Sequence, residues 1–287
     1  VNLLMRRKKI KNYRSLAFFS ALIIVALFCM LAKKAKAPDS SLDGTKSTSS
    51  ATVTTTADLN QLAWPEGATL SAKILMYHHV GPLPDGADDI RKGLTVSTEN
   101  FARQLKYLKD NNYTVTTLAK MYEMVAKGEK TDKVVVLSFD DGYSDNFVYA
   151  WPVMEKYQFS GTFFIISGKI GQNEYMGESQ IKQLALSGNE IGSHSVNHLS
   201  MDKLTGQKLK NEVKLSKESL GELTGKKIIS FCYPAGKFSE EAKADLKEAG
   251  YKMAVTTAKG KAFSADQPFE IPRYRINPTT NLESLLD

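Results

Sequence analysis

The sequence predicts an α/β fold in which seven or eight parallel strands alternate with helices and close, or nearly close, into a barrel. From Leu70 onward, short apolar runs rich in β-branched residues alternate with longer segments of helical period. This is the pattern of repeated βα units around a parallel sheet. One run, Val134–Leu137, is continuously apolar, as expected of a strand that is buried on both faces. The number of units favours a barrel over an open doubly wound sheet.

The apolar runs give the expected strands in order. They cover residues 72–77, 113–117, 133–139, 161–167, 190–194, 228–233 and 252–257, with 273–276 as a last strand. Helices are expected over residues 98–111, 205–223 and 239–249, with a cap at Ser97 or Thr98 before the first of them. The apolar residues on one face of the first two helices are Phe101, Leu105, Leu108, Leu209, Val213, Leu215 and Leu220.

The net charge of +7 is confined to the N-terminal end of the chain. Residues 1–58 hold 10 Lys and Arg against 3 Asp and Glu, whereas the chain from Leu59 onward holds 28 of each kind. Nucleic-acid binding depends on clustered positive charge. We therefore expect no nucleic-acid partner for the folded region.

The first sixty residues divide into three segments. Residues 1–15 are basic, residues 16–32 form an uncharged and mostly apolar run, and residues 33–60 are rich in Ser and Thr. The run is near the lower limit of the roughly 17 to 25 residues that span a bilayer, and the basic segment before it predicts a cytoplasmic N-terminus. We expect a signal anchor or transmembrane helix, a flexible linker, and a monomeric domain, residues 61–287, outside the cell membrane. The alternative is cleavage after the Ala-Lys-Ala stretch of the linker, which would release the domain.

All four histidines of the chain lie at the end of a predicted strand or just after one. His78 and His79 follow the first strand, His194 ends the fifth, and His198 follows it. In parallel barrels the reactive side chains come from the carboxyl ends of the strands. If the chain forms a helix after the fifth strand, His194 and His198 lie on one face and can bind one ion. The alternative is that these two histidines only decorate a loop.

Two adjacent carboxylates follow the third strand, at Asp140 and Asp141, and Gly142 allows a tight turn there. Carboxylates this close repel each other unless a cation or a shared proton intervenes. One of them can complete an Asp-His-His metal site with an open position for water, and the other can act as a base. A solvated turn is the alternative.

These residues resemble the polysaccharide deacetylases with a NodB homology domain, which form carbohydrate esterase family 4. SFDDG at 138–142 is similar to the first motif of that family and HSVNH at 194–198 to the second, while FCYPAG at 231–236 resembles the third more loosely. The resemblance covers about residues 70–280. It implies a distorted (β/α) barrel of seven or eight strands.

The resemblance also implies roles for individual residues. It implies that Asp140 is the general base and that a divalent metal, usually zinc, is bound by Asp141, His194 and His198. The oxyanion of the tetrahedral intermediate would be held by the metal and by a backbone N–H, which we expect to be that of Ala235.

Two departures from the family pattern redistribute these roles. The position of the arginine that orients the base is Cys232, and no histidine is available for the late motif that supplies the general acid. The segment ILMYHHV at 74–80 resembles the Tyr-His segment of the subgroup that acts on poly-N-acetylglucosamine. We therefore assign the general acid to His78, and we expect Arg273 to orient Asp140.

Taken together, the resemblance implies a metal-dependent N-deacetylase acting on N-acetylglucosamine units of an N-acetylated glycan, either peptidoglycan or poly-N-acetylglucosamine. Among the aromatic residues near strand ends, we expect Tyr143 and Tyr233 to stack on sugar rings. One alternative is an O-acetyl esterase of the xylan type on the same fold. The other is a glycan-binding module with impaired catalysis.

Overall fold

The computed structural model describes residues 69–260, 263–264 and 267–286. The predicted basic segment 1–15, the apolar run 16–32 and the linker 33–60 lie outside the described residues. Within the described ranges, no helix combines the length and the apolar composition needed to cross a bilayer.

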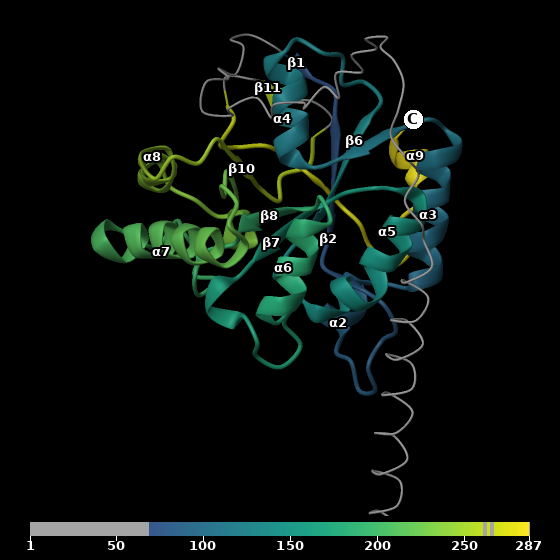
Figure 1. Cartoon of the computed structure of the whole chain (residues 1–287), viewed down its shortest axis with the longest axis horizontal. Helices are drawn as coiled ribbons and strands as arrows, with labels where there is room; N and C mark the ends of the chain where they lie inside the picture. Colours follow the sequence, from purple (N-terminus) through teal and green to yellow (C-terminus); the bar gives the residue numbers. More distant parts are fainter. Residues whose placement is uncertain (1–68, 261–262, 265–266, 287) are drawn as a thin grey trace, which may run out of the picture. The chain divides into compact units, whose positions relative to one another are not determined.

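The centre of the fold is a curled sheet of eight parallel strands (Figure 1). Each of the eight predicted strands is confirmed and lies within its predicted range. The strands are β2 (Lys73–Tyr77), β5 (Thr114–Thr116), β6 (Val134–Phe139), β7 (Thr162–Ile165), β8 (Glu190–Ser193), β9 (Ser230–Cys232), β10 (Met253–Val255) and β12 (Tyr274–Arg275).

The strand order is β10-β9-β8-β7-β6-β2-β12, and β5 also pairs with β6. The segment from Ile271 to β12 connects the two sides of the curl. Ile271 forms a parallel bridge with Val255 of the edge strand β10, and Tyr274 of β12 pairs with Leu75 of β2. Two small sheets accompany it. They pair β1 (Thr69–Leu70) with β11 (Phe263–Ser264) and β3 (His79–Val80) with β4 (Thr95–Val96).

Strand β6 is buried on both faces, as its continuous apolar run predicts. Val135 and Leu137 belong to a large hydrophobic cluster that includes the helices, whereas Val134 and Val136 belong to a second cluster. The second cluster lies inside the curl, since it collects side chains from β2, β6, β7, β9 and β10. Successive residues of a strand point to opposite faces, so one sequence run serves both clusters.

Helix α4 (Leu118–Ala126) covers the amino end of the curl. Its buried residues join the inner cluster. Its first N–H groups donate to the opening residues of two strands, from Leu118 N to Thr162 Oγ1 at 3.0 Å and from Ala119 N to Glu190 Oε2 at 2.8 Å. The carboxyl end of the curl is therefore the end left for a functional site.

The other helices lie along the sheet, with α3 and α5 together on one side and α7 and α8 together on the other (Figure 1). The helical predictions at 98–111, 205–223 and 239–249 are confirmed, and Ser97 is the cap of α3 through a bond from Asn100 N to Ser97 Oγ. The helices are α2 (Asp89–Leu94), α3 (Thr98–Asp110), α5 (Trp151–Tyr157), α6 (Glu178–Leu186), α7 (Gly206–Thr224), α8 (Glu240–Glu248) and α9 (Leu282–Leu286). A π-helix, η2 (Asn146–Ala150), precedes α5, and 3-10 turns occur at η3 (Ser167–Lys169) and η4 (Pro234–Gly236).

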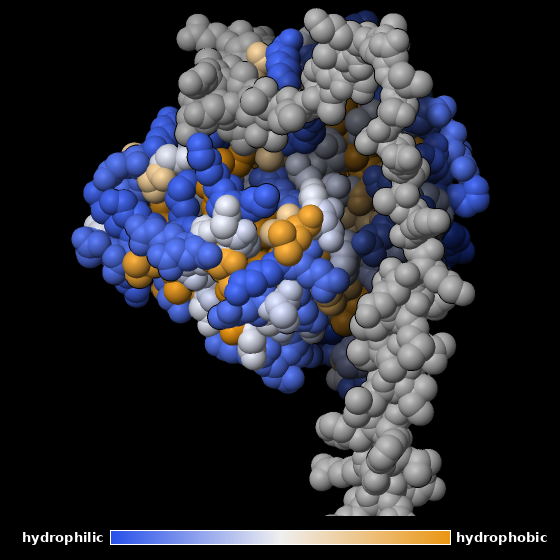
Figure 2. Space-filling model, viewed as in Figure 1, coloured by the Kyte–Doolittle hydropathy of each residue, from blue (hydrophilic) through white to orange (hydrophobic). Residues whose placement is uncertain are grey.

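One apolar position of α7 is not in the core. Leu209, Val213 and Leu220 are buried, but Leu215 is 50% exposed and does not share their face of the helix. The buried stripe advances in steps of three and four residues and passes through Ser216, which is fully buried. Leu215 lies outside this stripe. On the face of the molecule drawn in Figure 2, small hydrophobic areas are separated by hydrophilic ones.

These two leucines on one helix form a matched pair for a stability measurement. We expect Leu209→Ala to lower the free energy of unfolding by about 2 to 5 kcal/mol, because it leaves a cavity in the core. Leu215→Ala should change it by less than about 0.5 kcal/mol. Urea denaturation followed by circular dichroism measures both values, and equal losses would contradict the burial of α7 described here.

Candidate active site

The register of the sheet brings the predicted catalytic residues together at the carboxyl end of the curl. Tyr77 pairs with Phe139, and Asp140 N donates to Tyr77 O at 3.0 Å. The residue directly after β2 is His78, whose Nε2 lies 4.0 Å from Asp140 Oδ2. The two residues are 62 positions apart in the sequence, and parallel pairing of β2 and β6 is what makes them neighbours.

Asp140 is held by a buried arginine. Arg273 Nη1 donates to Asp140 Oδ1 at 2.7 Å, and Nη2 donates to Oδ2 at 2.7 Å. The guanidinium is fixed by further bonds from Nε to Thr256 O at 2.9 Å and from Nη1 to Ser138 Oγ at 3.1 Å. Arg273 is 1% exposed. The contact that was expected of Arg273 is therefore present, as a bidentate pair of the strong, planar kind.

The arginine also decides the charge of Asp140. Burial alone would raise the pKa of Asp140, but the charge and hydrogen bonds of Arg273 outweigh it and hold that pKa well below its usual range. The Asp140 carboxylate is therefore ionised at any pH near neutrality.

Asp141 points away from Asp140 toward two imidazoles. Its backbone has a positive φ of 71°, and its Oδ1 lies 3.3 Å from His194 Nε2 and 3.4 Å from His198 Nε2. The other nitrogen of His194, Nδ1, lies 2.7 Å from the carbonyl oxygen of Cys232. A proton on Nδ1 donated to that carbonyl leaves the lone pair of Nε2 directed at Asp141.

This geometry fits a zinc-sized divalent ion. Two ligand atoms at about 2.0 to 2.1 Å from a tetrahedral zinc lie about 3.4 Å apart. The distances from Asp141 Oδ1 to the two Nε2 atoms match that spacing, and all three ligand atoms lie within 4.8 Å of one another. Two imidazoles and one carboxylate are also a usual donor set for catalytic zinc, which keeps a further position for water.

The histidine pair is assembled by a turn, and not by the helix that the sequence argument gave as the condition for their convergence. Ser195 and His198 both have positive φ, 61° and 59°, and His198 N donates to Ser195 Oγ at 2.9 Å. The turn still places the two rings 4.7 Å apart between centroids. The left-handed backbone conformations of Ser195 and His198, and not a helix, bring the two imidazoles together.

Glu212 holds this turn, and the sequence argument missed it. Its Oε2 accepts from Val196 N at 2.9 Å and from Asn197 N at 2.8 Å, and its Oε1 accepts from Asn197 Nδ2 at 2.7 Å. Glu212 is 4% exposed and lies on α7 beside Val213. The available signal was an acidic residue within the apolar stripe of that helix, because buried carboxylates require partners.

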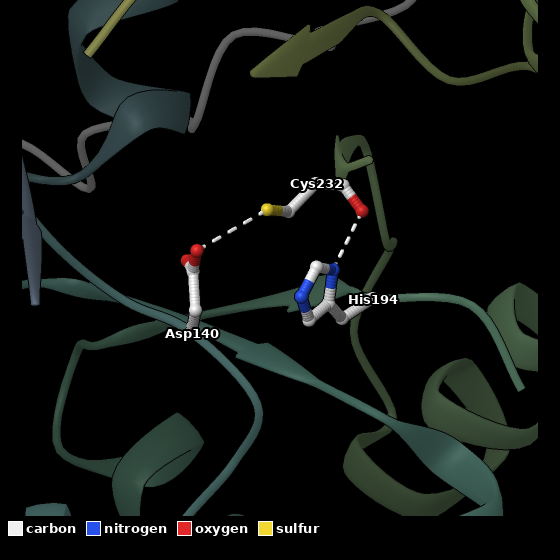
Figure 3. Close-up of side chains that lie close together, drawn as sticks. All are labelled: Asp140, His194 and Cys232. Carbon is white, nitrogen blue, oxygen red and sulfur yellow. Dashed lines mark hydrogen bonds between the residues drawn. The ribbon is translucent and has the colours of Figure 1, made fainter. Parts of the chain in front are cut away.

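A second group of possible ligands lies next to the first (Figure 3). It consists of Asp140, His194 and Cys232. Both oxygens of Asp140 are engaged by Arg273, His194 Nδ1 faces the Cys232 carbonyl, and burial raises the pKa of the Cys232 thiol. A protonated thiol is a poor ligand. The Asp141 group is therefore the better candidate metal site.

The two tyrosines expected at the substrate differ in position. Tyr143 is partly exposed and stacks between His79, at 3.8 Å between ring centroids, and Tyr175, at 5.2 Å. Tyr233 is 0% exposed and stacks on Phe238 in the core. Its expected stacking on sugar is therefore wrong, because a fully buried ring presents no face to a ligand.

Ala235 lies in the turn after β9, at a positive φ of 52°. The adjoining Gly236 has φ 69°, and a Cβ there would lie 2.2 Å from Thr257 Oγ1. Only glycine fits that position, so the turn that presents the Ala235 backbone has a fixed path.

Comparisons with known proteins identify the family of this chain. The family model described as polysaccharide deacetylase matches residues 127–254. The protein YxkH of Bacillus subtilis (strain 168), which is assigned to the polysaccharide deacetylases, is 32% identical over 206 residues, which cover 71% of each chain. The chain belongs to the polysaccharide deacetylase family. The peptidoglycan-N-acetylglucosamine deacetylase of Bacillus cereus is 30% identical over 125 residues, which are 43% of this chain and 56% of that protein.

A solved structure confirms the family fold. The deacetylase PplD of Streptococcus pyogenes, in complex with acetate, superposes with a TM-score of 0.70 and 28% sequence identity. The match covers 77% of this chain and 97% of that chain. The curled parallel sheet with flanking helices is thus the fold of a deacetylase of this family.

Metal binding by the candidate site can be measured without any substrate. We expect Asp141→Asn and His198→Ala to weaken zinc binding by more than about 100-fold, because even the loss of a residue behind the ligands costs about 10- to 100-fold. Isothermal titration of metal-stripped protein with zinc gives the affinity. His79→Gln is the matched control, since His79 lies outside the group, and wild-type affinity in His198→Ala would exclude this site.

Proposed function

We propose that this chain is a metal-dependent N-deacetylase that hydrolyses the acetamido groups of N-acetylglucosamine units in peptidoglycan or poly-N-acetylglucosamine. The observation that carries the proposal is the pairing of an ionised Asp140, clamped by Arg273, with the adjacent group of Asp141, His194 and His198. Family membership, the name of the Bacillus cereus relative and the Tyr-His segment at residues 77–78 support the substrate class.

Asp140 is suited to the role of general base. Each oxygen of an ionised carboxylate has two lone pairs, and Arg273 uses one on each oxygen. The remaining lone pairs can accept the proton of an attacking water. The guanidinium holds the carboxylate in one orientation while that transfer occurs.

We propose zinc as the metal at Asp141, His194 and His198. When bound there, the ion would lower the pKa of a water molecule and polarise the acetamide carbonyl. His194 is oriented for this by the Cys232 carbonyl, and His198 by the turn that Glu212 holds. We assign the Ala235 backbone N–H to the oxyanion and Tyr143 to the sugar.

His78 is the proposed general acid. Its Nε2 lies 4.0 Å from Asp140 Oδ2, and the side chain is 12% exposed. Burial lowers the pKa of His78, and the negative charges of Asp140 and Asp141 oppose that change. The protonated form is thereby a stronger acid, but it is less populated at neutral pH. As the C–N bond breaks, His78 donates its proton to the leaving nitrogen, and the products are acetate and a free amine.

For the rest of the chain we propose a distorted (β/α) barrel domain over residues 61–287, acting as a monomer outside the cell. We propose that residues 16–32 anchor it to the cell membrane, with residues 1–15 in the cytoplasm and residues 33–60 as the linker. The uncharged run of 17 residues behind a basic segment supports this arrangement.

Acetate release tests the activity directly. We expect the zinc-loaded protein to release acetate and to create free amines on peptidoglycan or on N-acetylglucosamine oligomers. Asp140→Asn should lower the rate at least about 100-fold, because it removes the general base. Activity confined to O-acetylated xylan would favour the O-acetyl esterase, and no release from any N-acetylated polymer would favour the binding module.

The role of Arg273 predicts a change in pH dependence. In Arg273→Ala the Asp140 pKa loses the effect of the cation and rises, so the acid limb of the kcat/KM profile should move to higher pH as kcat falls. Arg273→Lys should keep that limb near its wild-type position while lowering kcat, because lysine retains the charge but not the bidentate geometry. Near-normal turnover in Arg273→Ala would contradict the proposed role.

A further inference from the structure

The segment His78–His79 is held by two consecutive residues of the loop that follows β6. Asn146 Nδ2 donates to the backbone carbonyl of His78 at 2.8 Å. Asp145 Oδ2 lies 2.7 Å from His79 Nδ1. Asn146 is 0% exposed and His79 is 3% exposed, so both contacts are shielded from solvent.

The imidazole of His78 depends on this support. Its Nδ1 is buried and has no hydrogen-bond partner among the described residues. No side chain of the described part of the protein therefore fixes the ring through that nitrogen. The direction of Nε2 toward Asp140 then depends on the backbone path at His78 and His79. Asn146 and Asp145 bind this stretch of the chain.

Asp145 and Asn146 have further contacts or a defined place in the fold. Arg91 Nη2 donates to Asp145 Oδ2 at 3.2 Å, and Arg91 Nη1 lies 3.7 Å from Glu174 Oε1. The ring of His79 also stacks on Tyr143 at 3.8 Å between centroids. Asn146 is the first residue of the π-helix η2, a rare element that often occurs at functional sites.

We propose that Asp145 and Asn146 are positioning residues for the proton donor His78, acting through the backbone carbonyl of His78 and the side chain of His79. This inference rests on the proposed deacetylase function and assigns roles that the family motifs do not cover. The segment after β6 then carries the base Asp140, the metal ligand Asp141 and the two residues that position the acid, Asp145 and Asn146. These groups are therefore held in fixed positions relative to one another.

The test uses two substrates that differ in their leaving group. An amine must be protonated as it leaves an N-acetylglucosamine unit, whereas the nitrophenolate of p-nitrophenyl acetate leaves without a proton. Both substrates need Asp140 and the metal group, and only the amide needs His78. A defect in acid positioning therefore slows the amide alone, while general damage to the site slows both.

We expect Asn146→Ala to lower kcat on N-acetylglucosamine oligomers by roughly 10- to 100-fold, within the range that a general acid contributes. Its kcat on p-nitrophenyl acetate, after subtraction of the rate of Asp140→Asn, should stay within about threefold of wild type. His78→Ala should show the same selective loss. Zinc content should not change in either variant.

The matched control is Asn189→Ala. Asn189 is also buried and also binds backbone groups, accepting from Gly161 N at 3.0 Å and donating to Leu184 O at 3.3 Å, but it precedes β8 at the opposite end of the sheet. It should keep the wild-type ratio of the two rates. Any loss of stability common to both asparagine variants is thereby separated from the effect on the acid.

Two outcomes would overturn the inference: equal losses on both substrates in Asn146→Ala, or full activity on both. If Asn146→Ala does not fold, Asp145→Ala decides by the same ratio, since Asp145 is the less buried of the two. If wild-type protein releases acetate from p-nitrophenyl acetate but from neither peptidoglycan nor any N-acetylglucosamine oligomer, the proposed function fails and not the positioning role.

Discussion

The buried pair of Arg273 and Asp140 is the interaction on which the site depends. Two charges removed from water cost several kcal/mol each unless the geometry compensates. Here two bonds of 2.7 Å join the ions, and Thr256 O, Ser138 Oγ and Cys232 Sγ accept from the other three guanidinium N–H groups. The pair links β6 to the segment that bridges both edges of the sheet, so the base and the closure of the curl are one structural unit.

The neighbouring carboxylates of Asp140 and Asp141 illustrate how one short loop separates two functions. Asp140 continues the line of β6 into the interior of the curl, where it meets Arg273. Asp141 takes a left-handed backbone conformation, with φ 71°, and turns its carboxylate to the two histidines. The two carboxylates therefore point in different directions. Asp140 pairs with Arg273, and Asp141 lies beside His194 and His198.

Cys232 occupies the position at which the resemblance implies an arginine that orients the base. Its thiol lies 3.2 Å from Arg273 Nη2, and its backbone carbonyl oxygen lies 2.7 Å from His194 Nδ1. The small side chain at this position leaves room for the guanidinium of Arg273. Cys232 therefore contacts both the arginine that binds Asp140 and the candidate metal ligand His194.

The sequence by itself determined the strands, most of the helical faces and the identity of the acidic and histidine motifs. These depend on local periodicity and on residue type, which can be read along one segment. The support of the site could not be read in this way. Glu212, Asp145 and Asn146 act on residues that only become neighbours through the folding of the chain. The burial of Tyr233, in contrast to the partial exposure of Tyr143, likewise depends on how the surrounding elements pack.

The contact of Arg273 with Asp140 was inferred from family pattern, but its bidentate form came from the tertiary structure. So did the turn at residues 194–198, since the spacing of His194 and His198 had only indicated that they would converge if a helix formed there. The physical reason is common to all these cases. Local propensity specifies where strands begin and end, whereas the register between strands and the packing of helices against them decide which polar side chains meet at the carboxyl end of the sheet.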